Sequence, residues 1–310
     1  MNEQFYEKLR QILSENQIKT KEPLANHTTL RIGGEADYFV TPSTIDEIEE
    51  VTNLCKQEEI PYYIMGNGSN LLVSDEGYRG LIMKLSDNFS AYGISEDGIV
   101  RAQAGILLSK LANEIARKEL TGFEFAAGIP GTLGGAVTMN AGAYDGEMKQ
   151  CLTRVWVLDE DGKVIEIPKD ELELGYRSSA LQKRRMILLE AELKLAQGKQ
   201  EQIFARMQDL NARRREKQPL DKFSAGSTFK RPEGYYAGKL ISDAGLRGFQ
   251  IGGAAVSEKH CGFLINKDNA SAEEFLRLIN EVIQIVKDKY GVTLEPEVKL
   301  LGHFNVQLHR

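Results

Sequence analysis

The sequence predicts an α+β fold with two or three domains, and two observations support this. Segments with the apolar spacing of helices are mixed along the whole chain with short strand-like runs, without the strict alternation of a doubly wound sheet. The chain has 310 residues, which is enough for two or three domains that each bury a core. We find no internal repeat and no low-complexity tract.

The first predicted helix is amphipathic, with Phe5, Leu9, Ile12 and Leu13 on one face. Farther along, Thr44 and Glu47 form a plausible capping box, and Pro61 ends the helix that they open. The expected elements in this part are a helix over 2–16, a strand over 36–42, a helix over 44–60 and a strand over 62–65.

The later segments are predicted in the same way. Asp161-Gly162 marks the turn of a hairpin over 154–168, and Pro219 ends a basic helix that is interpreted as a domain junction. The other expected elements are a helix over 107–120, a strand over 186–195, a polar loop over 173–185, a helix over 199–219, several short pieces, a closing helix over 271–291 and a strand-like run over 294–302.

Composition excludes several classes of protein. The net charge of −6 disfavours a general nucleic-acid binder. The four histidines lack metal-ligand spacing, so no metal site is expected, and no apolar run is long enough to span a bilayer. No signal peptide is evident, and the three separated cysteines suggest buried thiols in a reducing compartment, so a cytoplasmic location is expected. The cysteines are Cys55, Cys151 and Cys261.

Two glycine-rich segments are the most informative motifs. The run from Gly128 to Glu147 holds six glycines and almost no charge. The second segment is the turn over 66–70, which directly follows a predicted strand. Neither contains the dinucleotide fingerprint or the phosphate loop. Glycine allows other atoms to approach the backbone closely and adopts positive φ, so either a ligand or another part of the same polypeptide lies against this backbone. A tight turn, or packing between two lobes, remains the alternative.

These segments also belong to a series that resembles one family. GNGSNLLVSD, GIPGTLGGAVTMNAGAYDGE, GYRSS, SAGSTFKRP, GLRGFQIGGAAVS, FLINKDNA and LEPEVKLLG occur in this order. Together they resemble the UDP-N-acetylenolpyruvoylglucosamine reductase (UDP-N-acetylmuramate dehydrogenase) family over about Leu24 to Gly302. No insertion follows Tyr176-Arg177, so the chain is similar to the shorter subclass, which lacks a tyrosine that covers the nucleotide.

The resemblance implies a two-lobed FAD-binding unit of the vanillyl-alcohol-oxidase type, followed by an α+β substrate-binding domain. The implied divisions are a lead-in over 1–30, the FAD-binding domain over 31–198 with lobes of about 31–98 and 99–198, a connecting helix over 199–218, the substrate domain over 219–302 and a tail over 303–310.

The resemblance also assigns cofactor residues. Non-covalent FAD is expected because neither glycine segment contains a histidine or cysteine that could be the attachment point. The implied pyrophosphate ligands are Gly66, Asn67, Gly68, Ser69 and Asn70, and the implied lining of the rest of the flavin is Ile129, Pro130, Gly131, Gly134, Gly135, Asn140 and Gly142.

The implied activity is an FAD-dependent oxidoreductase reaction of bacterial cell-wall precursor synthesis, in which NADPH reduces the enolpyruvyl group of a UDP-sugar. By motif, Ser227 is the proton donor, Arg177 lies near the substrate carboxylate and Glu297 is the catalytic glutamate. Glu297 is preferred to Glu295 because it lies in the P-E-V pattern. Another flavin oxidoreductase, or a binding module without catalysis, is the alternative function.

Looser motifs suggest substrate contacts and partners. A surface role is nearly as good an explanation for most of these residues, and Arg213 to Arg215 are interpreted as a solvated helix end. The expected partner is a UDP-sugar, without nucleic acid or membrane, and a monomer is expected. The residues suggested for substrate binding are Tyr176, Lys217, Arg247, His260 and Asn266.

Overall fold

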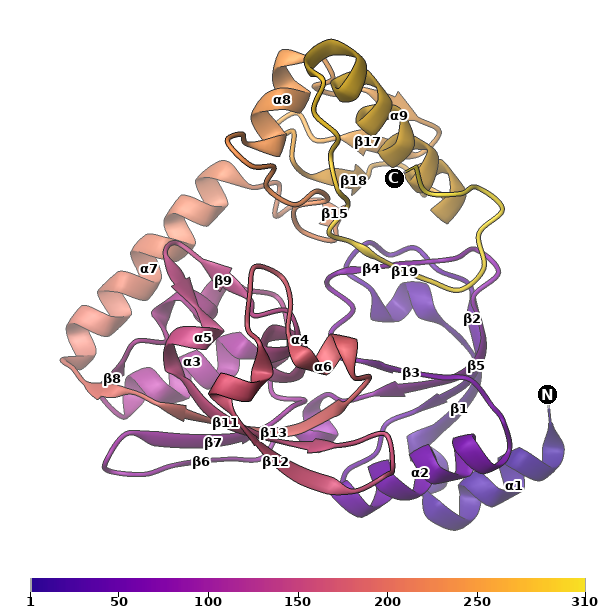
Figure 1. Ribbon diagram of the computed structural model, residues 1–310, viewed down its shortest axis with the longest axis vertical. Coiled ribbons are helices and arrows are strands. Elements are labelled where there is room, and N and C mark those ends of the chain that lie inside the picture. Colours follow the sequence, from indigo (N-terminus) through magenta and orange to yellow (C-terminus); the bar gives the residue numbers. More distant parts are fainter. Residues whose placement is uncertain (1, 310) are drawn as a thin grey trace. The chain divides into compact units, whose positions relative to one another are not determined.

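The computed structural model describes residues 2–309, which form two compact units (Figure 1). Neither unit is continuous in sequence. Unit 1 contains the chain up to Thr20, Tyr38–Asn67 and Gly80–Arg214. Unit 2 contains Lys21–Asp37, Gly68–Arg79 and the chain from Arg215 onward.

The largest sheet of unit 1 is antiparallel and five-stranded. Leu158 pairs with Val164 across the predicted hairpin, and Gly162 in its turn has a φ of +80°, which explains the glycine. The strands in spatial order are β12 (Val164–Pro168), β11 (Leu152–Leu158), β13 (Ile187–Lys194), β7 (Ile99–Gln103) and β6 (Tyr92–Ile94).

A second sheet has the order β1 (Ile18–Pro23), β2 (Glu35–Val40), β5 (Tyr78–Lys84) and β3 (Tyr62–Met65), and β3 runs parallel to β5. The helices α1 (Glu3–Ile12) and α2 (Ile45–Gln57) precede and follow β2 in the chain. The predicted capping box of α2 is half right. Thr44 accepts from the Glu47 N–H, but the Glu47 carboxylate accepts from Ser43 and Gln17 instead.

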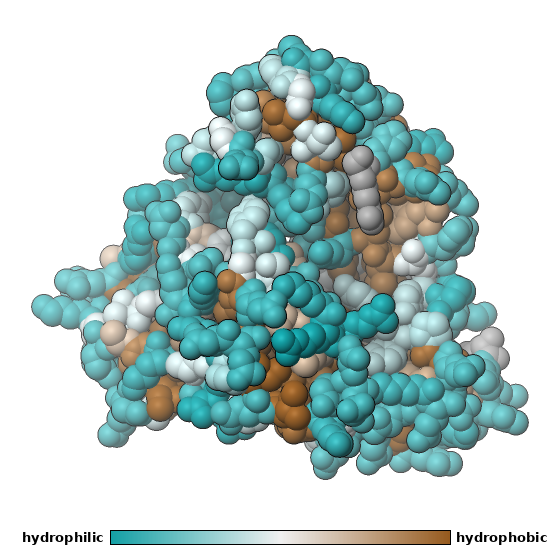
Figure 2. Space-filling view, in the orientation of Figure 1, coloured by the Kyte–Doolittle hydropathy of each residue, from teal (hydrophilic) through white to brown (hydrophobic). Residues whose placement is uncertain are grey.

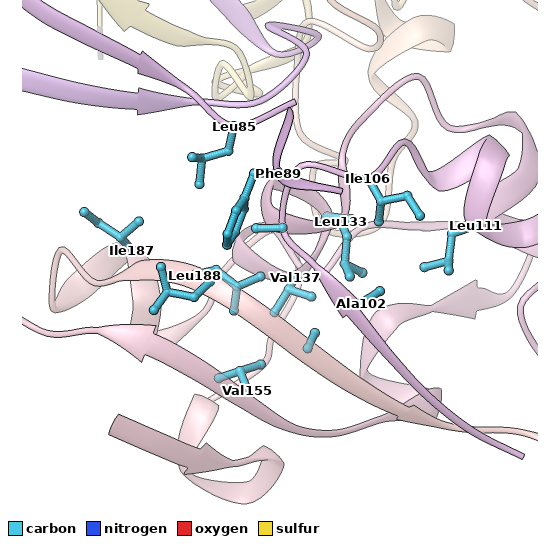
Figure 3. Packing of buried hydrophobic residues seen from close by; sticks show 14 of the residues in the cluster. Leu85, Phe89, Ala102, Ile106, Leu111, Leu133, Val137, Val155, Ile187 and Leu188 are labelled. Carbon is cyan, nitrogen blue, oxygen red and sulfur yellow. The ribbon is translucent and has the colours of Figure 1, made fainter. Parts of the chain in front are cut away.

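The remaining elements of unit 1 include those of the glycine-rich run itself. Figure 3 shows Leu133 and Val137 of α4 among buried side chains that include Ile106, Leu111 and Leu188. The apolar side chains of α4 therefore anchor this run in the core. These elements are α3 (Leu108–Arg117), β8 (Leu120–Thr121), α4 (Leu133–Thr138), β9 (Gly142–Ala143), β10 (Gly146–Glu147), α5 (Met148–Cys151), α6 (Ala180–Lys183), β14 (Ala196–Gln197) and α7 (Gln200–Lys217), whose last three residues lie in unit 2.

Unit 2 has its own core around α9 (Ala272–Tyr290). Ser271 and Glu274 form a capping box, and Gly291 ends the helix in the left-handed conformation. The other elements are an antiparallel sheet of β15 (Phe223–Ser224), β18 (Leu264–Asn266), β17 (Ala254–Val256) and β16 (Gln250–Ile251), the helix α8 (Ala237–Asp243), and a parallel pair of β4 (Leu71–Val73) and β19 (Lys299–Leu301).

Hydrophilic residues dominate the face in view in Figure 2. None of the helices in residues 2–309 combines the length and the apolarity that a bilayer crossing requires. The same residues contain no cluster of three or more histidine, cysteine or acidic side chains that could hold a metal ion. All three cysteines are buried free thiols, which confirms their prediction as small core residues.

Candidate active site

The start of the 66–70 turn meets the 128–147 run within unit 1. The side-chain amide of Asn67 donates to the main-chain oxygen of Pro130 at 2.8 Å. A Cβ atom on Gly66 would lie 2.2 Å from the hydroxyl of Thr132, so only glycine fits there. The sequence predicts both segments as cofactor-binding, and the structure brings the first part of the 66–70 turn against the start of the 128–147 run.

This backbone presents a series of unused hydrogen-bond donors. Within residues 2–309, the main-chain N–H groups of residues 66–70 donate to no protein acceptor, and neither do those of Gly131, Thr132 and Gly135. Successive free N–H groups of this kind bind anions such as phosphate. The residues present therefore fit the pyrophosphate of FAD, which needs donors and little side-chain charge.

Gly134 and Gly142 of the 128–147 run lie against other parts of the same polypeptide, whereas Gly135 does not. A Cβ on Gly134 would lie 3.0 Å from the Ala104 Cβ, and a Cβ on Gly142 would lie 2.6 Å from the Gly146 oxygen. Around Gly135, by contrast, the nearest atom to such a Cβ is the Thr132 hydroxyl at 3.9 Å, and Gly135 is exposed. Chain packing accounts for Gly134 and Gly142, whereas an approaching ligand remains the better explanation for Gly135.

Gly68 is constrained by the chain around it. Its φ is +61°, and a Cβ there would lie 2.1 Å from the His27 oxygen. Its carbonyl accepts from the Thr29 N–H at 3.3 Å. These contacts fix the middle of the turn, in which Ser69 is half-buried. Farther along the second segment, Ile129 is half-buried and Pro130 is exposed.

The side chain of Asn140 has a structural task. It is buried, donates to the Glu147 carboxylate at 3.0 Å and to the Gly175 oxygen at 3.1 Å, and accepts from the Lys149 N–H at 2.9 Å. Its amide therefore ties the glycine-rich run to the Tyr176-Arg177 turn. A contact between Asn140 and the flavin stays a prediction.

Tyr176 and Arg177 form the tip of a tight turn in unit 1. Gly175 and Ser178 exchange both main-chain hydrogen bonds, at 3.1 and 3.3 Å. Arg177 has a φ of +53°, and its guanidinium carbon lies 5.0 Å from the centre of the exposed Tyr176 ring. A strained tip of this kind is held by its surroundings, as at many functional sites.

Ser227 and Glu297 are brought together within unit 2. The Glu297 N–H donates to the Thr228 oxygen at 2.8 Å, and Phe229 and Pro296 form an antiparallel bridge. The Ser227 hydroxyl donates to the Phe229 oxygen at 3.2 Å and must leave this bond to act as a proton donor elsewhere. Glu295 differs from Glu297: it is more exposed and pairs with Lys230.

The predicted substrate residues have different surroundings in unit 2. Arg247 is exposed and donates to the Glu258 oxygen. His260 is half-buried and accepts from the Gly262 N–H at 3.1 Å through Nδ1. Burial, with a smaller contribution from the Arg247 cation, lowers the pKa of His260 below 6.5.

The other two residues suggested for substrate binding, Lys217 and Asn266, differ in whether the side chain is free to contact a ligand. Lys217 is exposed at the end of α7. The buried Asn266 side chain instead donates to the Leu30 oxygen at 3.0 Å and accepts from the Ala270 N–H at 2.8 Å. These bonds give Asn266 a structural role, and a substrate contact for it stays a prediction.

Two residues near the site were missed by sequence reasoning. Arg213 and Arg215 are exposed as expected, but Arg214 is partly buried, and a Cβ on Gly128 would lie 3.2 Å from its guanidinium. Burial lowers its pKa. Gln182 donates to the oxygens of Thr138 and Arg177 at 2.7 and 3.3 Å. Arg214 has helical spacing from the buried Met207 and Leu210, and this signal could have predicted its partial burial. Nothing local in the sequence indicates the contacts of Gln182.

Comparison with known families assigns two parts of the chain to families of known domains. Residues 36–168 match the FAD binding domain family, and residues 218–301 match the family described as the C-terminal domain of UDP-N-acetylenolpyruvoylglucosamine reductase. A reductase of that name from Lachnoclostridium phytofermentans is 52% identical over 305 residues, which cover 97% of this chain and 98% of the relative. The chain belongs to the UDP-N-acetylenolpyruvoylglucosamine reductase family.

Other reductases of this family extend the similarity. The Clostridioides difficile protein is 50% identical and covers 97% of this chain and 99% of its own. The crystal structure of the Thermus caldophilus reductase has a TM-score of 0.79 at 36% identity, covering 92% of this chain and 100% of that one. The glucose oxidase variant of Phl p 4, at 15% identity and a TM-score of 0.51 over 64% of this chain, shares the fold alone.

These findings confirm the family, the α+β fold with an FAD-binding domain and a C-terminal domain, and the class of enzyme. The chain is an FAD-dependent oxidoreductase. The unused N–H groups of the two glycine segments are the feature of this reductase-family fold that suits the cofactor.

Proposed function

We propose that this chain uses NADPH and FAD to reduce the enolpyruvyl group of UDP-N-acetylglucosamine enolpyruvate to UDP-N-acetylmuramate in peptidoglycan precursor synthesis. The relatives named as reductases of this substrate class support the reaction. The single observation that carries it is the bridge between Phe229 and Pro296, because it holds the segments of Ser227 and Glu297 side by side.

The reaction adds two hydrogens across a vinyl ether. Residues of the 66–70 turn and of the 128–147 run would hold FAD, which would supply hydride transfer from the nicotinamide to the methylene carbon of the substrate. Negative charge then develops at the neighbouring carbon and spreads into the carboxylate, so this carbon must be protonated. We assign the proton to the hydroxyl of Ser227, which acts only when the acceptor carbon is within hydrogen-bond reach.

The charged groups have complementary tasks. Arg177 carries a permanent, planar cation that can meet the substrate carboxylate bidentately and stabilise the charge developing there. Glu297 is assigned to the protonated enolic form of that carboxylate or to a chain of donors ending at Ser227.

We further assign UDP-sugar binding to Tyr176, Lys217, Arg247, His260 and Asn266. The exposed Lys217 ammonium suits a diphosphate. The exposed Tyr176 ring and the Arg247 guanidinium suit the nucleotide-sugar. The side-chain amide of Asn266 is hydrogen-bonded to main-chain groups in this structure, so its assignment to the substrate rests on its sequence motif.

We also infer non-covalent FAD, a monomeric protein and a cytoplasmic location. Histidine and cysteine are missing from the sequence of residues 66–70 and 128–147, where attachment would be expected. The three buried free thiols suit a reducing compartment. The domain roles proposed are FAD binding for 31–198 and substrate binding for 219–302.

The test is the stoichiometry of turnover. Purified protein loaded with FAD is incubated with NADPH and the UDP-enolpyruvyl sugar while oxygen uptake is recorded. The proposal predicts one NADPH oxidised for each sugar reduced, with little oxygen consumed, and a product heavier by two hydrogens in mass spectra. NADPH oxidation that follows oxygen uptake and leaves the sugar unchanged would identify a flavin oxidase instead.

A further inference from the structure

The 66–70 turn continues directly into a strand that pairs with the segment after Glu297. In unit 2, β4 runs parallel to β19, with Leu71 opposite Lys299 and Val73 opposite Leu301. The pairing extends one residue back, because the Lys299 N–H donates to the Asn70 oxygen at 3.0 Å. The end of the predicted pyrophosphate turn is therefore part of the ladder that holds the C-terminal strand.

The side chain of Asn70 reaches one step farther. Its amide nitrogen donates to the main-chain oxygen of Glu297 at 3.3 Å, although the two residues are 227 positions apart. On its other side, the Glu297 N–H donates to the Thr228 oxygen at 2.8 Å. The two main-chain polar groups of Glu297 are thus held by two different segments, one that ends the glycine turn and one that follows Ser227.

The Ser227 side of this arrangement is itself fixed. Thr228 donates from its N–H to the Gly262 oxygen at 2.9 Å, and its hydroxyl accepts from the Leu264 N–H at 3.1 Å. Thr228 is buried, so these bonds are shielded from water. The glycine turn carries unused N–H groups over the same residues 66–70. Of the two contacts to Glu297, the one from Asn70 is therefore the one that a ligand on the turn can change.

We propose that Asn70 is a positioning residue that couples occupancy of the FAD pyrophosphate turn to the placement of Glu297. An anion bound by the N–H groups of residues 66–70 orders the turn, and the ordered Asn70 amide then fixes the Glu297 carbonyl. The catalytic consequence rests on the proposed function of Glu297. The coupling is reciprocal, so fixing Glu297 also favours binding on the turn.

This role differs from that of a plain cofactor ligand. One N–H of the Asn70 amide is directed at Glu297, so only its second N–H is left for a phosphate. Asn67, in the same turn, instead directs its side chain at Pro130 in the second glycine segment. Substitution of Asn67 is therefore expected to affect FAD binding, whereas substitution of Asn70 is expected to affect Glu297.

The first measurement needs no variant. Hydrogen–deuterium exchange of the peptide over residues 294–301 is compared in the wild-type holoenzyme and after removal of FAD. The coupling predicts exchange at least tenfold slower when FAD is bound. Equal exchange in both forms would overturn it, because occupancy of the turn would then leave the Glu297 segment unchanged.

The second measurement separates positioning from ligation. Asn70→Leu keeps the approximate size of the side chain but removes the donor without adding charge, and Asn70→Ala removes both the size and the donor. We expect each to bind FAD within about threefold of wild type, to lose the protection of 294–301 by FAD, and to slow flavin reoxidation by the sugar more than tenfold. Reduction by NADPH should stay within about threefold.

The surface variant Asn305→Ala is the control. It removes an exposed amide of unit 2 that donates to Glu273, and it should leave protection and both half-reactions unchanged. The contrary result would be Asn70 variants that bind FAD more weakly and still show slower exchange over 294–301 when FAD is saturating. In that case Asn70 is only a cofactor ligand and the proposal is wrong. Protection that behaves as predicted in a wild-type protein whose flavin ignores the sugar would overturn the proposed function and leave the coupling intact.

Discussion

The amide of Asn67 donates to the main-chain oxygen of Pro130 at 2.8 Å and so joins the start of the 66–70 turn to the 128–147 run within unit 1. Both segments present main-chain N–H groups that no acceptor within residues 2–309 uses. A single side chain therefore holds together the two pieces of backbone that are predicted to bind FAD.

Asn67→Ala should loosen this junction. Loss of one side-chain to main-chain hydrogen bond costs about 1 kcal/mol, so FAD affinity should fall roughly fivefold or more. Quenching of flavin fluorescence on binding gives the dissociation constant. Asn113→Ala is the matched control, because Asn113 also donates to a main-chain oxygen, that of Ser109, on an exposed face of α3. Equal effects of the two substitutions would remove Asn67 from the cofactor site.

Gly134 and Gly135 make a second matched pair. Gly134→Ala would press a methyl group against Ala104 and should destabilise the fold by about 1–3 kcal/mol. Gly135→Ala meets open space and a negative φ, so helix propensity should stabilise the apoprotein by about 0.5–1 kcal/mol.

FAD affinity completes this comparison. Gly135→Ala should bind FAD at least tenfold more weakly, because its methyl group occupies the open side that a ligand would approach. Urea unfolding of the apoprotein and a flavin titration measure the two effects separately. Unchanged FAD affinity in Gly135→Ala would mean that the flavin does not approach this helix turn.

Much of the scaffold of both units could be predicted from the sequence. The capping box of Ser271 and Glu274, the apolar face of α9 and Gly291 are local signals, and each agrees with the tertiary packing. The hairpin turn at Gly162 is local in the same sense. Periodicity and turn chemistry suffice for such elements.

Other features depend on contacts that no local pattern records. The helix α4 forms in spite of two glycines because Leu133 and Val137 pack into the core (Figure 3). The half-formed capping box of α2 has a similar cause, since Gln17 competes for Glu47. For the site, motif order located the glycine turns, but the bond from Asn70 to Glu297 spans 227 positions and has no sequence signal.

Ser227→Ala should separate the two half-reactions. Flavin reduction by NADPH should stay within about threefold of wild type, while reoxidation by the enolpyruvyl sugar should slow by about 100-fold or more, as expected for loss of a general acid. Stopped-flow absorbance at the flavin band measures both rates. Ser95→Ala, on an exposed turn of unit 1, is the control. An equal loss in both half-reactions would contradict the proton-donor assignment.

His260 should titrate abnormally. Burial lowers its pKa from 6.5, and the Arg247 cation lowers it further. The unfolded chain therefore takes up a proton near pH 6.5 while folded His260 stays neutral, so this residue contributes stability above pH 6.5 that is lost as the pH falls through the folded pKa.

Proton NMR can follow this titration because the chain has only four histidines. The His260 ring signal should show a midpoint below 6.5, and Arg247→Ala should move that midpoint part of the way back. His260→Gln should reduce the loss of stability between pH 7 and 5 in urea unfolding. A midpoint of 6.5 or above would contradict the buried, neutral imidazole.

The most direct test of the central claim is an anaerobic absorption experiment on the FAD-loaded protein with two additions. NADPH should bleach the flavin bands, and the UDP-enolpyruvyl sugar should then restore them in proportion to the sugar added. Bands that bleach with NADPH but do not return with the sugar would contradict the proposed reductase activity while keeping the protein an FAD-dependent oxidoreductase.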